Sequence, residues 1–265
     1  MAITCPAGFD VERLRAQVLA TYEQVARNPG GEFHFHRGAR YAAEYLHYDP
    51  AELALLPEEC TARFAGVGNP LRIGPLRRGE TVLDHACGGG MDVLLAARRV
   101  GPEGHVIGID MTPAMREAAA KSAERAGLAA VVEIRAGFFE ELPVDDESVD
   151  VILSNGVVNL SPDKSHVFRE IHRVLRPGGR LYLADVVVQR ELKHEVRNNP
   201  DLWAACIGGA LPEPELSELA LETGFADPRI VQRFDCFRGT TAEAKVSRDL
   251  RVHSVNFQAN KPIQE

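Results

Sequence analysis

The sequence predicts an α/β protein in which a Rossmann-like, doubly wound sheet of seven strands follows an N-terminal helical extension. Two observations carry this prediction. From Glu80 onward, short β-branched runs alternate with helical patterns, which indicates a parallel sheet with right-handed crossovers. Before Gly79 the signals are helical only. We therefore expect a helical extension or lid at residues 1–78 and the main domain at residues 79–265.

The extension contains several helix signals. Asp10 is placed to cap a helix, and the sequence Asn-Pro-Gly-Gly at 28–31 ends it. Apolar and aromatic residues recur at helical spacing through residues 37–48. The sequence Asp-Pro-Ala-Glu at 49–52 is a capping box with proline at the first helical position, so it predicts another helix start.

The main domain is expected to alternate strands and helices. Strands are predicted at residues 81–85, 105–110, 131–135, 149–154, 180–188, 229–234 and 252–259. Helices are predicted at residues 91–100, 112–126, 163–175, 202–210 and 213–223. Thr112 is placed to cap the second of these helices, with Pro113 at its first position. The last two strands are expected to be antiparallel.

The composition limits the class of protein. The chain is 45% hydrophobic and 26% charged, which is ordinary for a soluble globular protein. Its net charge of −8 disfavours nonspecific attraction to nucleic acid or to an anionic membrane surface. No run approaches the roughly 18 apolar residues of a spanning helix, and the N-terminus lacks a signal-peptide pattern. We expect a soluble, cytoplasmic protein that acts on a small molecule, and no pattern specifies an oligomeric state.

Thiols and imidazoles are candidates for chemistry. The cysteines are odd in number and far apart, which favours free thiols over disulfides or a zinc ribbon: Cys5, Cys60, Cys87, Cys206 and Cys236. The sequence Phe-His-Phe-His at 33–36 places His34 and His36 on one side of an extended segment. A metal needs a third ligand that no spacing selects, so we expect no metal site. As part of a lid, both histidines are candidate proton acceptors in catalysis.

A glycine-rich turn and an acid predict a nucleoside-containing cofactor. The turn at residues 86–90 leaves a predicted strand and opens a helix, and Asp110 ends the next strand, where a carboxylate can accept both ribose hydroxyls. The turn lacks the third glycine of G-x-G-x-x-G, which disfavours NAD. Asp84, at the end of the first strand, suits a cationic sulfonium or ammonium better than a pyrophosphate. S-adenosylmethionine therefore fits the pattern best.

Four motifs in order resemble those of the class I S-adenosylmethionine-dependent methyltransferases. They are Asp84-x-Ala86-x-Gly88-x-Gly90, then Asp110, then the segment from Leu142 to Asn155, and then Arg176-Pro-Gly-Gly-Arg180. The resemblance covers residues 80–234 and implies S-adenosylmethionine as cofactor and S-adenosylhomocysteine as product. The residues implied to hold the cofactor are Asp84, Gly88 and Gly90 at the methionine end with Ala86 and Asp92 beside them, Asp110 at the ribose, Met111, Phe138 and Phe139 at the adenine, and Asn155 beside the sulfonium.

Three segments resemble the arsenite methyltransferase group more closely, at residues 98–112, 154–164 and 202–211. Enzymes of that group hold As(III) with cysteine thiolates, which are soft donors for a soft centre. Here Gly156 and Val67 occupy two positions where the resemblance implies cysteines, and only Cys206 remains. We expect a related methyltransferase with an altered acceptor site, in which Cys206 and Asn155 are the catalytic candidates together with His34 and His36.

Other interpretations stay open from the sequence. Arsenite methylation would need Cys206 to be joined by another thiol, Cys60 or Cys87, and Cys206 is alternatively a small core residue. The Ala-Cys-Gly sequence at 86–88 also resembles quinone C-methyltransferases. From other classes, the chain could be a dehydrogenase, which the missing glycine disfavours, or a noncatalytic cofactor-binding regulator. Methyl transfer itself is an in-line displacement that mainly requires alignment and an unprotonated nucleophile.

Overall fold

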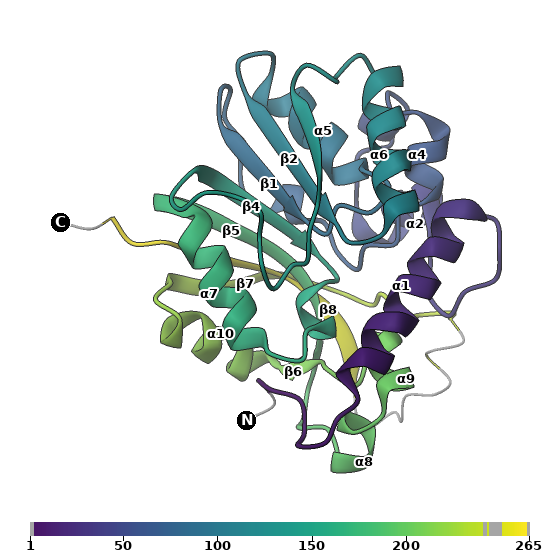
Figure 1. Cartoon of the computed structure of the whole chain (residues 1–265), viewed down its shortest axis with the longest axis vertical. Coiled ribbons are helices and arrows are strands. Elements are labelled where there is room, and N and C mark those ends of the chain that lie inside the picture. The colour runs from purple at the N-terminus through teal and green to yellow at the C-terminus, as the bar shows by residue number, and fades with distance from the viewer. Residues whose placement is uncertain (1–2, 241–242, 244–250, 264–265) are drawn as a thin grey trace.

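One mixed sheet organises the chain, and the computed structural model describes residues 3–240, 243 and 251–263 of it (Figure 1). The strands are β1 (Thr81–His85), β2 (His105–Asp110), β3 (Val132–Ala136), β4 (Val149–Asn155), β5 (Leu175–Val188), β6 (Leu211–Pro212), β7 (Ala226–Phe234) and β8 (Val252–Asn260). Their order is β3-β2-β1-β4-β5-β8-β7, and the two-residue β6 pairs with β5 outside this path. The predicted α/β class with a doubly wound, seven-stranded sheet is confirmed, with β6 as a short addition.

The strand directions follow from the connections. The strands β1 to β5 are parallel, with Leu83 opposite Ile107 in β2 and Ile152 in β4. Each is joined to the next by a crossover, as parallel pairing requires. The final pair is antiparallel, because β8 runs against both β5 and β7. The change of strand order between β1 and β4 is a topological switch point, where α/β sheets open a crevice at the carboxyl ends of their strands.

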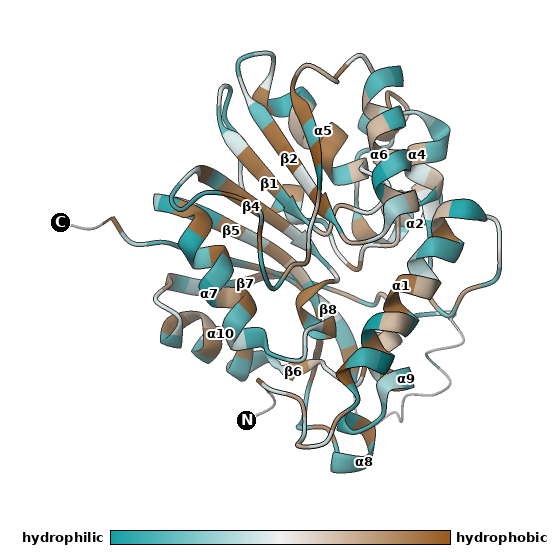
Figure 2. Ribbon diagram, viewed as in Figure 1, coloured by the Kyte–Doolittle hydropathy of each residue, from teal (hydrophilic) through white to brown (hydrophobic). Residues whose placement is uncertain are grey.

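Helices cover both faces of the sheet. The helices are α1 (Val11–Arg27), α2 (Gly38–Leu46), α3 (Pro50–Leu53), α4 (Glu58–Ala62), α5 (Met91–Val100), α6 (Pro113–Arg125), α7 (Lys164–Val174), α8 (His194–Arg197), α9 (Pro200–Ala204) and α10 (Glu213–Glu222), with 3₁₀ turns η1 (Pro70–Arg72) and η2 (Val158–Leu160). One core packs α7 and α10 on the sheet, and the other packs α5 and α6 on its opposite face. The strands β2, β4 and the second half of β5 are largely apolar, as expected for strands buried on both faces, whereas β8 alternates apolar and polar residues (Figure 2).

The N-terminal helices share a core with the sheet. Tyr41 and Leu46 of α2 lie in the same buried cluster as Leu94 and Leu95 of α5. Helix α1 begins at the Asp10 cap, whose side chain accepts a hydrogen bond from the Arg13 amide, and it packs on α6 and α9 (Figure 1). The extension is therefore helical, as expected, while the boundary at residues 78 and 79 stays a prediction. None of the described helices has the length and apolarity needed to cross a bilayer.

One predicted helix is wrong in its extent. The pattern at 202–210 predicts a continuous helix, but α9 ends at Ala204 and the chain turns through Cys206, which has φ +61°. The turn lets Gly208 and Gly209 pack directly on the ring of Trp203, and a Cβ at Gly209 would overlap the carbonyl oxygen of Asn159. This close backbone approach overrides the helical pattern. Thr112 occupies the predicted N-cap position of α6, although its side chain makes no capping hydrogen bond.

We expect Gly209→Ala to lower the free energy of unfolding by about 1–3 kcal/mol, because a methyl group there must displace Trp203 or Asn159. Urea unfolding measures this change. Gly30→Ala is the matched control, since the nearest atom to its Cβ would be the Asn28 side-chain oxygen at 3.8 Å. Equal stability of the two variants would contradict the packing argument.

Candidate active site

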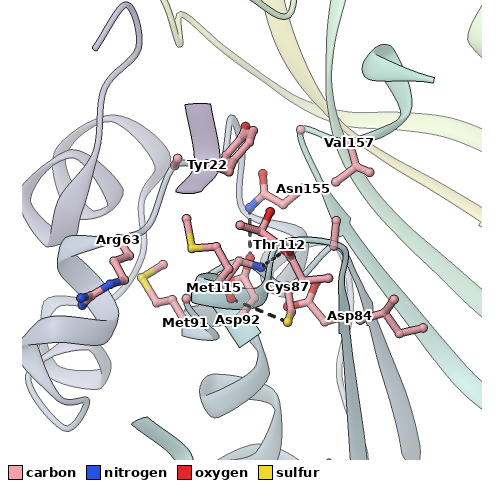
Figure 3. Close-up of a pocket in the computed structure, with 18 of the residues that line it drawn as sticks. Tyr22, Arg63, Asp84, Cys87, Met91, Asp92, Thr112, Met115, Asn155 and Val157 are labelled. Carbon is pink, nitrogen blue, oxygen red and sulfur yellow. Dashed lines mark hydrogen bonds between the residues drawn. The ribbon is translucent and has the colours of Figure 1, made fainter. Parts of the chain in front are cut away.

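A pocket of about 850 Å³ opens at the carboxyl ends of β1, β2 and β4, at the switch point of the sheet. Figure 3 shows Tyr22 entering it from α1, whereas Asn155 and Val157 enter from the sheet side. The residues predicted for the cofactor that line it are Asp84, Ala86, Gly88, Asp92, Asp110, Met111, Phe139 and Asn155. Part of this volume is open solvent at the mouth of the pocket.

The glycine turn forms one wall of the pocket. Ala86, Gly88 and Gly90 all have positive φ, at +68°, +52° and +87°. The amide of Gly88 donates to Oδ2 of Asp110 at 2.8 Å, so the turn is tied to the end of β2. Gly90 stands behind the wall, where its Cβ would lie 3.1 Å from Ala119 of α6. Ala86 adopts the left-handed conformation that favours glycine, which carries a modest strain.

Three buried carboxylates converge on the pocket. Asp84, Asp92 and Asp110 are 3%, 5% and 7% exposed. Burial raises the pKa of each, and the neighbouring charges of Asp92 and Asp110 raise that of Asp84 further. Hydrogen bonds to Asp110 from the amides of Thr112 and Gly88 oppose the increase in its pKa. This concentration of negative charge favours a ligand with a positive group.

Asn155 is held by its neighbours on every side. Its Oδ1 accepts from the amides of Val67 and Gly68 at 2.8 and 3.2 Å, and its Nδ2 donates to Oδ2 of Asp92 at 3.0 Å. The Tyr48 hydroxyl donates to Oδ1 of Asp92 at 2.7 Å. The side-chain amide thus joins β4, α5 and the loop before η1. Asn155 lines the pocket as expected, but its hydrogen-bonding capacity is largely used in holding that loop.

The predicted adenine contacts divide into two groups. Met111 and Phe139 line the pocket, and the Phe139 carbonyl oxygen lies 2.9 Å from Nε2 of His85. Phe138 does not line it: its ring is half exposed, and the guanidinium of Arg15 lies 5.7 Å from the ring centroid. Of these two neighbouring residues, only Phe139 is therefore placed to contact a ligand in the pocket.

The histidine candidates lie outside the pocket lining. Nε2 of His36 is 2.6 Å from the Arg238 carbonyl oxygen, and the ring stacks on Tyr41 at 5.0 Å. The ring of His34 packs edge-on against Phe35 at 4.8 Å. Both imidazoles belong to the aromatic packing of the extension, and their catalytic role stays a prediction.

Cys206 also lies outside the pocket lining, packed between two apolar clusters. Burial raises the pKa of its thiol strongly, and the charges of Asp185 and the thiol of Cys236 add to this. The thiol is therefore protonated at neutral pH. Cys60 and Cys87 line the pocket instead, on the side of the glycine turn, and burial raises the pKa of the Cys60 thiol to about 12.

The two positions where the resemblance implies cysteines lie next to each other. A Cβ at Gly156 would be 3.4 Å from Cγ1 of Val67. Val67 belongs to the cluster that also contains Cys206 and Cys236. The tertiary structure therefore brings Gly156, Val67 and Cys206 to one region, and two of these three positions carry no sulfur.

Sequence reasoning missed the pocket walls that come from the extension. These residues are Val18 and Tyr22 of α1 together with Arg63, Phe64, Ala65 and Gly66. The periodicity of α1 marks Leu14, Val18 and Val25 as a buried face but does not specify what that face covers. Met115, Val157 and Leu160 also line the pocket, but the sequence offered no reason to place them there, because apolar residues usually belong to the core.

Comparisons with known proteins agree with this geometry. Residues 76–235 match the family model described as a methyltransferase domain. The arsenite methyltransferase of Halobacterium salinarum is 39% identical over 84% of this chain and 57% of its own length, and that of Homo sapiens is 41% identical over 66% and 48%. The crystal structure of CrArsM, an arsenic (III) S-adenosylmethionine methyltransferase from Chlamydomonas reinhardtii, superposes with a TM-score of 0.72 at 36% identity over 80% of this chain and 73% of that chain. The chain thus spans about half to three-fifths of the length of these curated relatives.

We expect Asp84→Asn to raise the unfolding temperature of the ligand-free protein at pH 8, with a smaller gain at pH 5. The folded-state pKa of Asp84 is raised, so the wild type loses stability as pH rises from the unfolded-state value of about 3.9 through the folded-state value. Thermal unfolding between pH 5 and 8 measures the difference. Asp145→Asn, at an exposed carboxylate, is the control and should show no such trend. A lower unfolding temperature for Asp84→Asn at pH 8 would contradict the prediction.

Proposed function

The chain belongs to the methyltransferase-domain family and is related to the arsenite methyltransferases, and from this premise we propose that it transfers the methyl group of S-adenosylmethionine to a small acceptor. The observation that carries the proposal is the convergence of Asp84, Asp92 and Asp110 on one pocket beside a glycine turn. When bound, the cofactor supplies a methyl group on a cationic sulfur that is already a good leaving group.

The residues present suit this cofactor. Asp84 and Asp92 would face the cationic methionine end, because buried carboxylates with raised pKa gain most from a neighbouring positive charge. Asp110 would hold the ribose hydroxyls, and Met111 and Phe139 would flank the adenine. Each oxygen of Asp110 accepts one backbone amide at 2.8 Å, which leaves further lone pairs for a diol.

The other half of the pocket suits the acceptor. Val18, Phe64, Val157 and Leu160 make it largely apolar, and Tyr22 supplies a hydroxyl. Such a lining excludes water and aligns a compact acceptor for in-line attack. Val67 and Gly156 supply no thiolate, so we propose an acceptor other than an arsenic centre held by several sulfurs.

Asp110→Ala should weaken the binding of S-adenosylhomocysteine at least tenfold, because the variant lacks the carboxylate that would bind the ribose. Isothermal titration calorimetry at pH 7.5 measures the affinity, with Asp145→Asn as the control. Wild-type affinity in Asp110→Ala would refute the ribose assignment. Tight binding of NAD(H) by the wild type, with none of S-adenosylmethionine or S-adenosylhomocysteine, would refute the proposed function.

Cysteines placed at positions 67 and 156 should give the protein affinity for As(III). We expect the double variant Val67→Cys, Gly156→Cys to bind arsenite at least tenfold more tightly than the wild type, because two thiolates join Cys206. The backbone at Gly156 has a φ of +76°, which disfavours any residue with a Cβ. We therefore expect the cysteine there to lower the stability of the variant by about 1–2 kcal/mol, and thermal unfolding checks that it still folds. Tight arsenite binding by the wild type that Cys206→Ser abolishes would instead favour an arsenic acceptor.

A further inference from the structure

One phenol of the N-terminal extension is hydrogen-bonded to a carboxylate of the cofactor pocket. The hydroxyl of Tyr48 lies 2.7 Å from Oδ1 of Asp92, and Asp92 lines the pocket. Tyr48 is 3% exposed and lies outside the pocket lining. A side chain in this place affects a ligand through the carboxylate and not by direct contact.

The position of Tyr48 is set by its backbone and by its ring. The Tyr48 amide donates to the Ala42 carbonyl oxygen at 3.0 Å, and the ring packs edge-on against that of Phe64 at 5.2 Å. The hydroxyl has one proton, which it donates to Asp92, because the Gly68 carbonyl oxygen is further away at 3.3 Å. The packing of the extension therefore directs this proton at Asp92.

Three features stabilise the ionised form of Asp92. Tyr48 donates to its Oδ1, and Asn155 donates to its Oδ2 at 3.0 Å (Figure 3). The residue also lies in the first turn of α5, where the helix dipole favours a negative charge. Burial raises the pKa of Asp92, and the hydrogen bonds from Asn155 and Tyr48 oppose this increase. Each oxygen accepts one of these bonds and keeps a further lone pair for a ligand.

The neighbouring carboxyl of Asp84 is in a different environment. Burial and the charges of Asp92 and Asp110 raise its pKa well above the ordinary value. The negative charge on Asp92 thus opposes the ionisation of Asp84. Of these two carboxyls at the methionine end of the proposed site, Asp92 is therefore the one that ionises first.

We propose that Tyr48 is a positioning residue that holds the Asp92 carboxylate ionised and oriented for the cationic methionine end of the cofactor. The inference rests on the proposed function and adds a residue of the extension to cofactor recognition. Tyr48 acts through Asp92 by one charge-assisted hydrogen bond. The helical extension then contributes to the cofactor half of the pocket as well as to the acceptor half.

The first test compares two ligands of the full chain by calorimetry at pH 6.5. S-adenosylhomocysteine carries the amino-acid end with its ammonium group, whereas 5′-methylthioadenosine keeps the adenine, the ribose and the sulfur but lacks that end. We expect Tyr48→Phe to weaken the binding of S-adenosylhomocysteine about five- to tenfold, because a charge-assisted hydrogen bond is lost. The affinity for 5′-methylthioadenosine should change less than about twofold.

Tyr182→Phe is the matched control for this comparison. Tyr182 is also a buried phenol, but its hydroxyl donates to the Pro75 carbonyl oxygen at 3.4 Å and not to a carboxylate. Its loss should leave the affinity for both ligands unchanged. A loss of affinity in Tyr48→Phe that is equal for the two ligands would overturn the proposal, because Tyr48 would then shape the pocket in general.

The pH dependence of binding separates positioning from packing. Tyr48→Phe removes a donor to the anion, so the pKa of Asp92 should rise. The affinity of the wild type for S-adenosylhomocysteine should fall as the pH is lowered and Asp92 becomes protonated, and in the variant this fall should begin at a higher pH. The groups that interact electrostatically with Asp92 are common to both proteins, so the difference between the profiles reports the lost bond; they are Asp84 of β1, Arg99 of α5 and Cys60 of α4.

A double variant completes the test. In an Asp92→Asn background, residue 92 carries no charge for the phenol to stabilise, so Tyr48→Phe should weaken the binding of S-adenosylhomocysteine by less than about twofold. Additive losses in the double variant, or a pH profile that Tyr48→Phe leaves unshifted, would each overturn the positioning role. Failure of S-adenosylhomocysteine to bind the wild type would instead overturn the proposed function.

Discussion

The side-chain amide of Asn155 is the interaction on which the rest of the site depends. It connects the end of β4 to the Asp92 carboxylate at the start of α5 and to the loop at Val67 and Gly68. Gly66 must be glycine beside it, because a Cβ there would collide with the amide. Together with the hydrogen bond from Ser254 of β8 to the Val67 carbonyl oxygen, this group holds the loop of the N-terminal extension against the sheet at the mouth of the pocket. An amide suits this position because it both donates and accepts, which a carboxylate at neutral pH does not.

The electrostatics of the pocket oppose folding and favour binding. Burial raises the pKa of all three carboxylates, the charges of Asp92 and Asp110 raise that of Asp84 further, and these shifts lower the stability of the ligand-free chain as the groups ionise. Within residues 3–240, 243 and 251–263, the cations that act on them are Arg99 near Asp92 and Arg116 near Asp110. A ligand with a cationic end would relieve this repulsion and would therefore bind more tightly. Residues that lower stability in this way are typical of functional sites.

The acceptor half follows a different principle. Its walls come from α1, the loop at residues 64–68 and η2, and they are largely apolar. The arsenite methyltransferase of Halobacterium salinarum is 39% identical to this chain, in which the adjacent positions Val67 and Gly156 carry no thiol.

The sequence by itself determined the α/β class with its doubly wound sheet, the glycine turn, and the positions of Asp84 and Asp110 at strand ends, because these depend on local periodicity and on short motifs. It also indicated that Val67 and Gly156 were unusual. Only the tertiary structure decided that those two positions touch, that Tyr22 covers the pocket and that Phe138 faces solvent while Phe139 does not. It likewise shortened the predicted helix at 202–210, since Gly208 and Gly209 pack on Trp203. Contacts between residues more than 80 positions apart, such as Val67 with Asn155, depend on how the sheet and the extension pack together, and local pattern carries no information about that packing.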